Sequence, residues 1–111
     1  TRPIFQNIPF VITQFSSLSS QLRDEALRIS HMIHGVCCVI GVLDSKLKLF
    51  ISVDKPLTNQ INATDIANVL FPLLGGKGGG KPHLAMGGGD NVDAVPDLVS
   101  NAISIIEAAL Q

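Results

Sequence analysis

Glycine is concentrated in one short stretch of this chain, and that stretch most limits what the chain can form. Eight of the ten glycines lie between Gly75 and Gly89, in the segment GGKGGGKPHLAMGGG. An ordered glycine costs backbone entropy, so a fold that gathers glycines needs positive φ angles or close backbone approaches there. We therefore take this segment as the first place to look for a functional site.

The size and charge of the chain limit the kinds of function that it supports. With 111 residues and 46% apolar content, it can enclose one modest core, so residues 1–111 are predicted to form a single domain. A net charge of −1 gives no long-range field, so any contact with an acidic partner needs a local patch. No apolar run approaches the roughly 20 residues of a membrane span, and the N-terminal residues do not resemble a signal peptide. We expect a soluble domain that is not secreted.

The two cysteines, Cys37 and Cys38, are adjacent within the apolar run VCCVIGVL. Neighbouring strand residues point to opposite faces, so a disulfide between them would strain the backbone. Reduced, buried thiols are predicted, in agreement with an intracellular protein.

The hydrophobic patterns predict an α+β fold, a small mixed sheet with helices packed on it. Asn62 is expected to cap the middle helix and Pro72 to kink or end it. The expected order is strand 8–15, helix 17–34, strand 36–43, a hairpin at Asp44 to strand 47–53, helix 62–73, short strand 84–86 and helix 95–110. The glycine-rich segment is expected to be a loop before the last strand and helix.

Two nucleotide-binding motifs are excluded in the glycine-rich segment. Gly75 to Lys81 matches the first seven positions of G-x-x-x-x-G-K-[ST], but Pro82 follows, which has neither a hydroxyl for Mg²⁺ nor an N–H for phosphate. The fingerprint G-x-G-x-x-G does not fit in any frame. What remains is a loop whose backbone amides converge on an anion, flanked by Lys77 and Lys81. The alternative is that the glycines only allow tight turns and close packing.

The sequence GGKGGGKP, with the following LAM and GGG, closely resembles the signature of the C-terminal, DHHA1-related domain of alanyl-tRNA synthetases. The resemblance extends over nearly the whole chain and implies a DHHA1-like fold. It identifies residues 1–111 as the C-terminal domain of a larger synthetase, cytoplasmic or alternatively mitochondrial. The ends of the sequence are interpreted as fragment boundaries within that larger chain.

The family implies an RNA-binding role without catalysis by this domain itself. Its members bind the outer corner of the L-shaped tRNA and so help aminoacylation and editing, and some contribute to dimerisation. The implied partners are tRNA(Ala) and the rest of the synthetase, with DNA and a second copy of the chain as alternatives, and no cofactor or metal. The implied RNA-binding residues are Gly75, Gly76, Lys77, Gly78, Gly79, Gly80, Lys81 and His83, with Arg23 and Arg28 of the first helix as weaker candidates.

This chain departs from the family pattern in two respects. His83 replaces the acidic residue that commonly follows the proline, which suggests a local contact sensitive to pH. The chain is also poor in basic residues, which weakens the expectation of tight tRNA binding.

Two readings from other classes remain open. DHHA1 domains occur in phosphoesterases, in which a histidine directly follows the GGG, but Lys81 occupies that place here and the metal-binding half is missing. A structural dimerisation module is the second. With few aromatic residues to stack on bases, recognition is expected to favour shape and backbone over base identity.

Two groups of polar residues outside the glycine-rich segment are assigned structural roles. His31 and His34 share one helix face but lack further metal ligands at suitable spacing, so they are expected to complement the helix dipole. The same dipole argument assigns a capping role to Asp90, Asp93 and Asp97, where the last helix begins.

Overall fold

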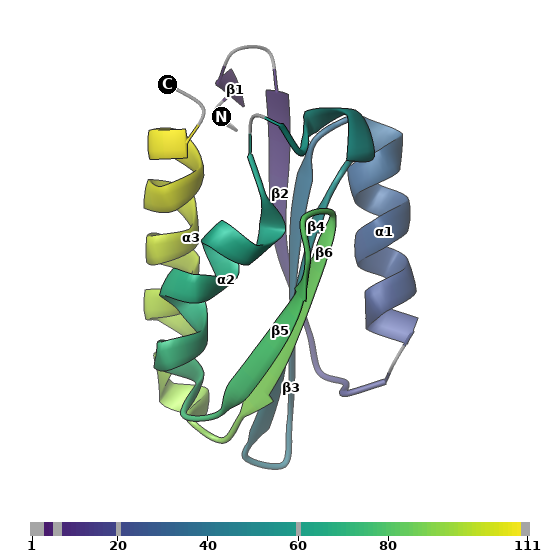
Figure 1. Ribbon diagram of the computed structural model, residues 1–111. Helices are drawn as coiled ribbons and strands as arrows, with labels where there is room; N and C mark the ends of the chain where they lie inside the picture. Colours follow the sequence, from purple (N-terminus) through teal and green to yellow (C-terminus); the bar gives the residue numbers. More distant parts are fainter. Residues whose placement is uncertain (1–3, 6–7, 20, 60, 110–111) are drawn as a thin grey trace.

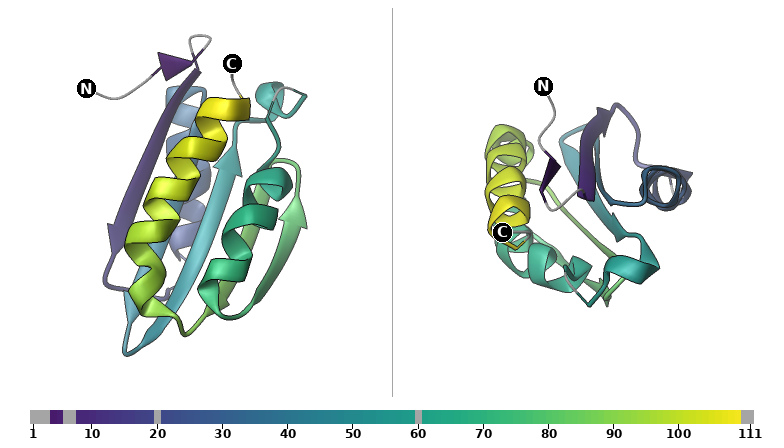
Figure 2. Two further views of the ribbon diagram at one scale, coloured as in Figure 1. Left: turned by 90° about the vertical axis from the view of Figure 1, so that its left-hand side faces the viewer. Right: turned by 90° about the horizontal axis from the view of Figure 1, so that it is seen from above.

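The computed structural model describes residues 4–5, 8–19, 21–59 and 61–109. In this part of the chain a six-stranded mixed sheet carries one helix on one face and two on the other (Figures 1 and 2). The strand order is β1-β2-β3-β4-β6-β5, and β2 and β3 are parallel whereas all other neighbours are antiparallel. The predicted α+β class with a small mixed sheet is confirmed.

The elements agree with most of the expected ranges. The strands are β1 (Ile4–Phe5), β2 (Ile8–Phe15), β3 (Val36–Leu43), β4 (Lys46–Val53), β5 (Lys77–Lys81) and β6 (Leu84–Gly89). The α-helices are α1 (Gln21–Ile33), α2 (Ala63–Leu70) and α3 (Val95–Ala109). Short 3-10 helices are η1 (Lys55–Leu57), η2 (Phe71–Leu74) and η3 (Val92–Ala94).

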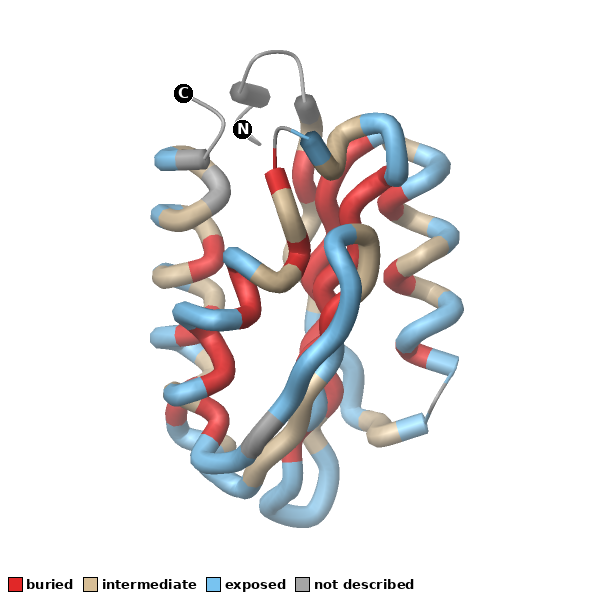
Figure 3. Tube along the Cα trace, viewed as in Figure 1, coloured by how far each residue is buried: buried red, intermediate tan, exposed pale blue. Residues whose placement is uncertain are grey.

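The alternating pattern of β4 decides which side chains reach which face of the sheet. Side chains alternate along a strand, and Leu47, Leu49 and Ile51 belong to the core covered by α2 and α3. Phe50 points the other way and packs under α1 with Cys37 and Val39. The side chains two or four residues from Phe50 therefore also lie on the α1 side of the sheet: Lys46, Lys48, Ser52 and Asp54. Figure 3 shows the buried strands between the two helical layers.

Helix α1 starts four residues later than predicted because serines form turns at its entry. The Ser19 amide donates to the Ser17 hydroxyl, and the Gln21 amide donates to the Ser19 hydroxyl. Such side-chain bonds compete with helix formation, so Leu18 lies outside the helix. The helix nevertheless buries Leu22 and Ala26, as its spacing predicted.

The end of α1 is a Schellman motif. The Gly35 amide donates to Ser30 O at 3.0 Å, and the His34 amide donates to His31 O at 3.2 Å. The left-handed residue is His34, with φ 52°, rather than the glycine that usually takes this position. Gly35 is required for another reason, since a Cβ there would lie 1.9 Å from Pro9 O.

The second predicted helix is shortened by its proline, as expected. The Asn62 side chain caps α2 by accepting from the Thr64 amide at 2.9 Å. Pro72 follows in η2, which ends at Gly75 with φ 70°. Val69 was predicted on the apolar face of this helix, but it is 47% exposed.

The prediction of a glycine-rich loop is wrong in its secondary structure. Lys77 to Lys81 form β5, an edge strand that pairs antiparallel with β6 across the turn at Pro82 and His83. The glycines of β6 continue the pairing up to Leu47 of β4. Glycine is depleted from strands, so the sequence pattern favoured a loop, whereas pairing with β6 supplies the order that the residues themselves lack.

Candidate nucleic-acid interface

One part of the sheet surface has none of the described helices packed across it. Helix α1 packs mainly on β2, β3 and β4, and α2 and α3 lie on the opposite face (Figure 2). We call the α1-side surface of β5 and β6, together with the Lys46–Lys48 end of β4, the open sheet face. By strand register Lys48 lies beside Gly88 on this face and Met86 lies beside Gly79, whereas Phe50, the β4 neighbour of Met86, is covered by α1.

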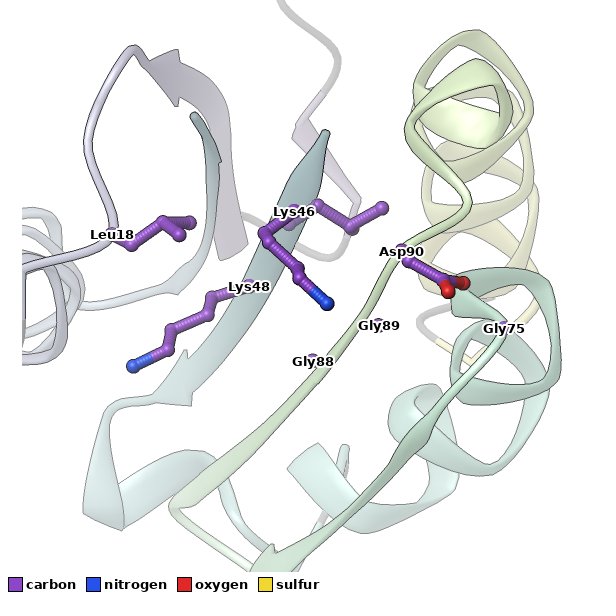
Figure 4. A pocket seen from close by; sticks show the side chains of 8 residues that line it. Leu18, Lys46, Lys48, Gly75, Gly88, Gly89 and Asp90 are labelled. Atoms are coloured by element: carbon purple, nitrogen blue, oxygen red, sulfur yellow. The ribbon is translucent and has the colours of Figure 1, made fainter. Parts of the chain in front are cut away.

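Four adjoining cavities follow the open sheet face. The first, about 480 Å³, is lined by Lys46, Lys48 and Asp90 over a floor of Gly88 and Gly89 (Figure 4). Lys48 and Gly88 also line the second cavity of about 150 Å³, and Met86 links that one to a third of about 370 Å³. Leu27 and His83 link the third to a fourth of about 520 Å³. Each cavity thus shares lining residues with the next.

The third cavity brings together four residues predicted from sequence. Arg23 of α1 lies across from Gly80, Lys81 and His83 of the β5–β6 hairpin. The Arg23 guanidinium is 3.4 Å from the carboxylate of Asp24, an exposed pair worth little free energy. Arg23 and Lys81 therefore place two positive charges at the rims of one cavity.

The other two cationic residues predicted from sequence are not placed at the third cavity by the described side chains. Arg28 is exposed on α1, where it pairs with Glu25 and contacts the Met32 sulfur, and it does not line the third cavity. For Lys77 only the backbone is described, paired in register with Gly88; its side chain lies outside the described part.

The glycines of the segment divide into two kinds. A Cβ at Gly76, Gly78 or Gly80 would lie between 1.9 and 2.5 Å from its nearest atom, and backbone atoms of β6 are among the contacts. Gly75 has a positive φ, a backbone conformation that residues with a side chain rarely adopt. Gly79 differs, since a Cβ there would meet nothing within 4 Å. Close packing explains the first kind, and Gly79 alone among these leaves open space over the open sheet face.

Charge is distributed unevenly between the two faces. Helices α2 and α3 contain Asp65, Asp97 and Glu107 but no lysine or arginine. The first and third cavities are instead lined by four cationic side chains and two acidic ones: Arg23, Lys46, Lys48 and Lys81 with Asp24 and Asp90. This surface is thus locally basic although the net charge of the chain is −1.

Comparison with known proteins identifies the family. A family model described as the DHHA1 domain matches residues 8–108. The chain belongs to the DHHA1 domain family. It is 36% identical over 72 residues to alanine–tRNA ligase of Staphylococcus epidermidis, covering 65% of this chain and 8% of that protein. It is 30% identical over 108 residues to alanine–tRNA ligase of Fervidobacterium nodosum, covering 96% of this chain and 12% of that protein.

The fold of this DHHA1 domain is also that of a solved structure. The C-Ala domain of Aquifex aeolicus alanyl-tRNA synthetase matches with a TM-score of 0.82 and 22% identity, over 99% of this chain and 97% of that one. The DHHA1 domain spans about a tenth of the length of the curated relatives that it matches.

Sequence reasoning missed several residues of the candidate site. From sequence, Lys46 falls in the predicted turn and Lys48 in the strand that follows, although the alternation KLKL already places both side chains on one face. Asp54 was not singled out, yet it is buried at 8% exposure, with one carboxylate oxygen 3.4 Å from His31 Nδ1 and the other 3.3 Å from His34 Nδ1. Its position beyond Ser52, with the same alternation, was the available signal.

Asp90, Asp93 and Asp97 do not share one role in the DHHA1 domain. Asp97 lies in the first turn of α3 and Asp93 in η3, as the dipole argument expects. Asp90 lines the first cavity with Lys46 (Figure 4).

The buried thiols of the DHHA1 domain lie beneath the sheet surface and outside the cavities' linings. The pKa of Cys37 is raised to about 12, mainly by burial and to a lesser extent by the nearby Glu25 carboxylate, while Arg28 opposes the shift. Burial also raises the pKa of Cys38 well above its ordinary value. Both thiols are thus protonated at neutral pH.

Within the described residues, no group of three histidine, cysteine, aspartate or glutamate side chains is placed to hold a metal ion. Among the described helices of the DHHA1 domain, none is long and apolar enough to cross a membrane.

Proposed function

We propose that this DHHA1 domain is the non-catalytic C-terminal domain of an alanine–tRNA ligase and that it binds tRNA(Ala) at the outer corner. The support for the ligase is the similarity to alanine–tRNA ligases along almost the whole chain. In this role the domain holds the tRNA while other parts of the ligase charge it and remove wrong amino acids.

The observation that carries the RNA-binding part is the basic, helix-free surface. Arg23, Lys46, Lys48 and Lys81 line consecutive cavities on the open sheet face. Their spacing along one surface suits a sugar-phosphate backbone, whose charge repeats along its length. The α2–α3 side, with its acidic residues, faces away from the RNA in this arrangement.

Gly79 supports close approach of the backbone. Glycine in a strand interior is unfavourable unless packing or a ligand requires it, and packing does not require it at Gly79. β5 is an edge strand, and edge strands leave alternate amides without a strand partner. Such amides donate to phosphate oxygens when no side chain stands in the way.

The test is a salt titration of binding to tRNA(Ala), an unrelated tRNA and a DNA duplex. The wild-type chain is compared with Lys46→Gln/Lys48→Gln/Lys81→Gln. Each lost phosphate contact lowers the slope of log K against log salt by about 0.7 to 0.9, so the triple variant is expected to lose about two to three units. The tRNA should bind more tightly than the duplex.

The matched control is Arg28→Gln, which removes one exposed cation that already pairs with Glu25. It should leave the slope nearly unchanged. Equal, weak binding by the wild-type chain and the triple variant would reject the tRNA role. A preference for the DNA duplex would favour a general nucleic-acid-binding domain, and concentration-dependent mass without RNA binding would favour a dimerisation module.

A further inference from the structure

The fourth cavity, which we call the histidine pocket, adjoins the RNA surface but has a different character. It measures about 520 Å³ and lies between the end of α1, the end of β4 and the β5–β6 turn. All three histidines of the chain line it, together with polar and apolar residues: Leu27, Ser30, His31, His34, Ser52, Val53, Asp54, Lys55, Pro56 and His83. Since it opens beside the third cavity, a ligand in it can belong to the same RNA.

Asp54 is the distinctive group of the histidine pocket. It is the only buried charged residue among the described side chains. Its backbone is fixed, because its amide donates to Gly35 O and its carbonyl accepts from the Leu57 amide. Its side chain does not cap η1. The described hydrogen bonds of its carboxylate are the two long contacts with His31 and His34, whose side chains are about 80% exposed.

These contacts leave the carboxylate available to a stronger donor. Hydrogen bonds of 3.3 and 3.4 Å exceed the usual range of 2.7 to 3.2 Å for N–H···O. Exposed imidazoles change rotamer readily. Two acceptor oxygens, held on a fixed backbone at the pocket wall, are thus accessible once the imidazoles turn.

His34 provides an independent indication of function. Its φ of 52° lies in the left-handed region, where a glycine would fit at the end of α1 without strain. A non-glycine residue in this region costs free energy and is found preferentially at functional sites. His34 therefore occupies a position at which glycine would be the more stable residue.

The rest of the wall is firm. Ser30 and Ser52 share a buried hydrogen bond of 2.6 Å between α1 and β4. The turn that carries His83 is anchored on both sides, because the Val53 amide donates to His83 O and the Ala63 amide donates to Pro82 O. The pocket is therefore built on paired backbone rather than on a free loop.

We propose that the histidine pocket binds an unpaired guanine base of the RNA, an inference that rests on the proposed RNA-binding function. A carboxylate only accepts hydrogen bonds, so it needs a base edge with two adjacent donors. Guanine presents N1–H and N2–H₂ side by side, whereas the Watson–Crick edges of adenine, cytosine and uracil each place an acceptor next to a donor. The imidazoles of His31 and His34 stack on the ring, as aromatic side chains do on splayed RNA bases.

The experiment measures the affinity of the 111-residue chain for labelled pentanucleotides by fluorescence anisotropy. The probes are UUGUU, UUAUU, UUCUU, UUUUU and UUIUU, in which inosine keeps N1–H but lacks the N2 amino group. UUGUU is expected to bind about tenfold more tightly than the A, C and U probes, and UUIUU in between. Equal affinities for all five probes, or no binding of any probe by a chain that binds tRNA, would overturn the proposal.

Two variants complete the test. Asp54→Asn keeps the shape but replaces one acceptor by a donor and removes a negative charge. The affinities for all five probes can then shift together, but the preference for guanine over the A, C and U probes should disappear. His34→Gly should fold at least as stably, because glycine suits the left-handed position, and should weaken the guanine preference. A preference that persists in Asp54→Asn would contradict the carboxylate's role.

The two proposals fail separately. Salt-dependent binding of tRNA without a base preference rejects only the guanine pocket. A guanine preference among the pentanucleotides without tRNA binding keeps the pocket and rejects the tRNA role.

Discussion

At the scale of single residues, the three glycines of β5 differ in the space that is available for a Cβ atom. Gly78→Ala and Gly80→Ala place a methyl group against β6 and should lower the free energy of unfolding by about 1 to 3 kcal/mol. Gly79→Ala meets open space and should be neutral or stabilise by about 0.5 to 1 kcal/mol. Urea unfolding of the three variants measures both effects. A loss for Gly79→Ala as large as for the other two would contradict the division.

The buried thiols predict a fall in stability at alkaline pH. The pKa of Cys37 is raised to about 12 by burial, and that of Cys38 is raised as well. The folded state therefore favours the protonated thiols, a contribution that is complete below pH 9.0 and is lost as the pH rises through the folded-state pKa values. Between pH 9 and 10 the free energy of unfolding should drop by about 1 kcal/mol for each thiol.

The measurement is urea unfolding under reducing conditions at pH 8, 9 and 10. Cys37→Ala/Cys38→Ala serves as the control, because it is less stable throughout but lacks the thiols. Its stability should depend less steeply on pH than that of the wild-type chain. Parallel curves for the two proteins would assign the alkaline loss to other groups.

At the scale of elements, the β3–β4 hairpin offers a site for stabilisation. Asp44 and Ser45 have φ of 52° and 64°, the positive values of a type I′ turn, which favours Asp-Gly and Asn-Gly. Ser45→Gly should raise the free energy of unfolding by about 1 kcal/mol, since it removes left-handed strain from a serine. Thermal unfolding should shift upward by about 4 °C.

The matched control for this change is Ser100→Gly, an exposed serine within α3. Glycine in a helix interior should lower the stability by roughly 0.5 kcal/mol or more. An equal effect of both substitutions would show that the turn conformation is not the cause.

Most elements were predictable because their signals are local. The structure agrees with the apolar run of β3, the alternation of β4 and the Asn62 cap of α2. The start of α1 was not predictable from its apolar spacing, since serine side chains bond the backbone ahead of it. β5 was missed because its order comes from β6, a neighbour that propensity does not include.

At the scale of the whole molecule, the separation of charge predicts which side the RNA covers. Binding of tRNA should slow hydrogen exchange at amides of β5, the β5–β6 turn and the exposed side of α1. Amides of α2 and α3 should be unaffected, because those helices carry acidic residues and lie behind the sheet. Hydrogen exchange followed by mass spectrometry measures this, and protection confined to α2 and α3 would reject the open sheet face.

The candidate site was only partly predictable for a reason that belongs to the whole fold. Lys81, His83 and Arg23 were identified, two of them through their place in the glycine-rich signature. Lys46, Lys48 and Asp54 are distant from that signature in sequence and join it only through the pairing of β4 with β6. A site assembled from separate strands depends on sheet order, which no single segment encodes.

The two kinds of glycine in β5 also show which positions of the glycine-rich motif are constrained by the fold. Along KGGGK, Gly78 and Gly80 pack against the neighbouring strand, whereas Gly79 and Lys81 lie on the side of the open sheet face. The motif thus combines two sets of positions that alternate along the strand. The positions at Gly78 and Gly80 are constrained by packing within the fold, whereas the alternate positions are free to vary with the ligand without unfolding the protein.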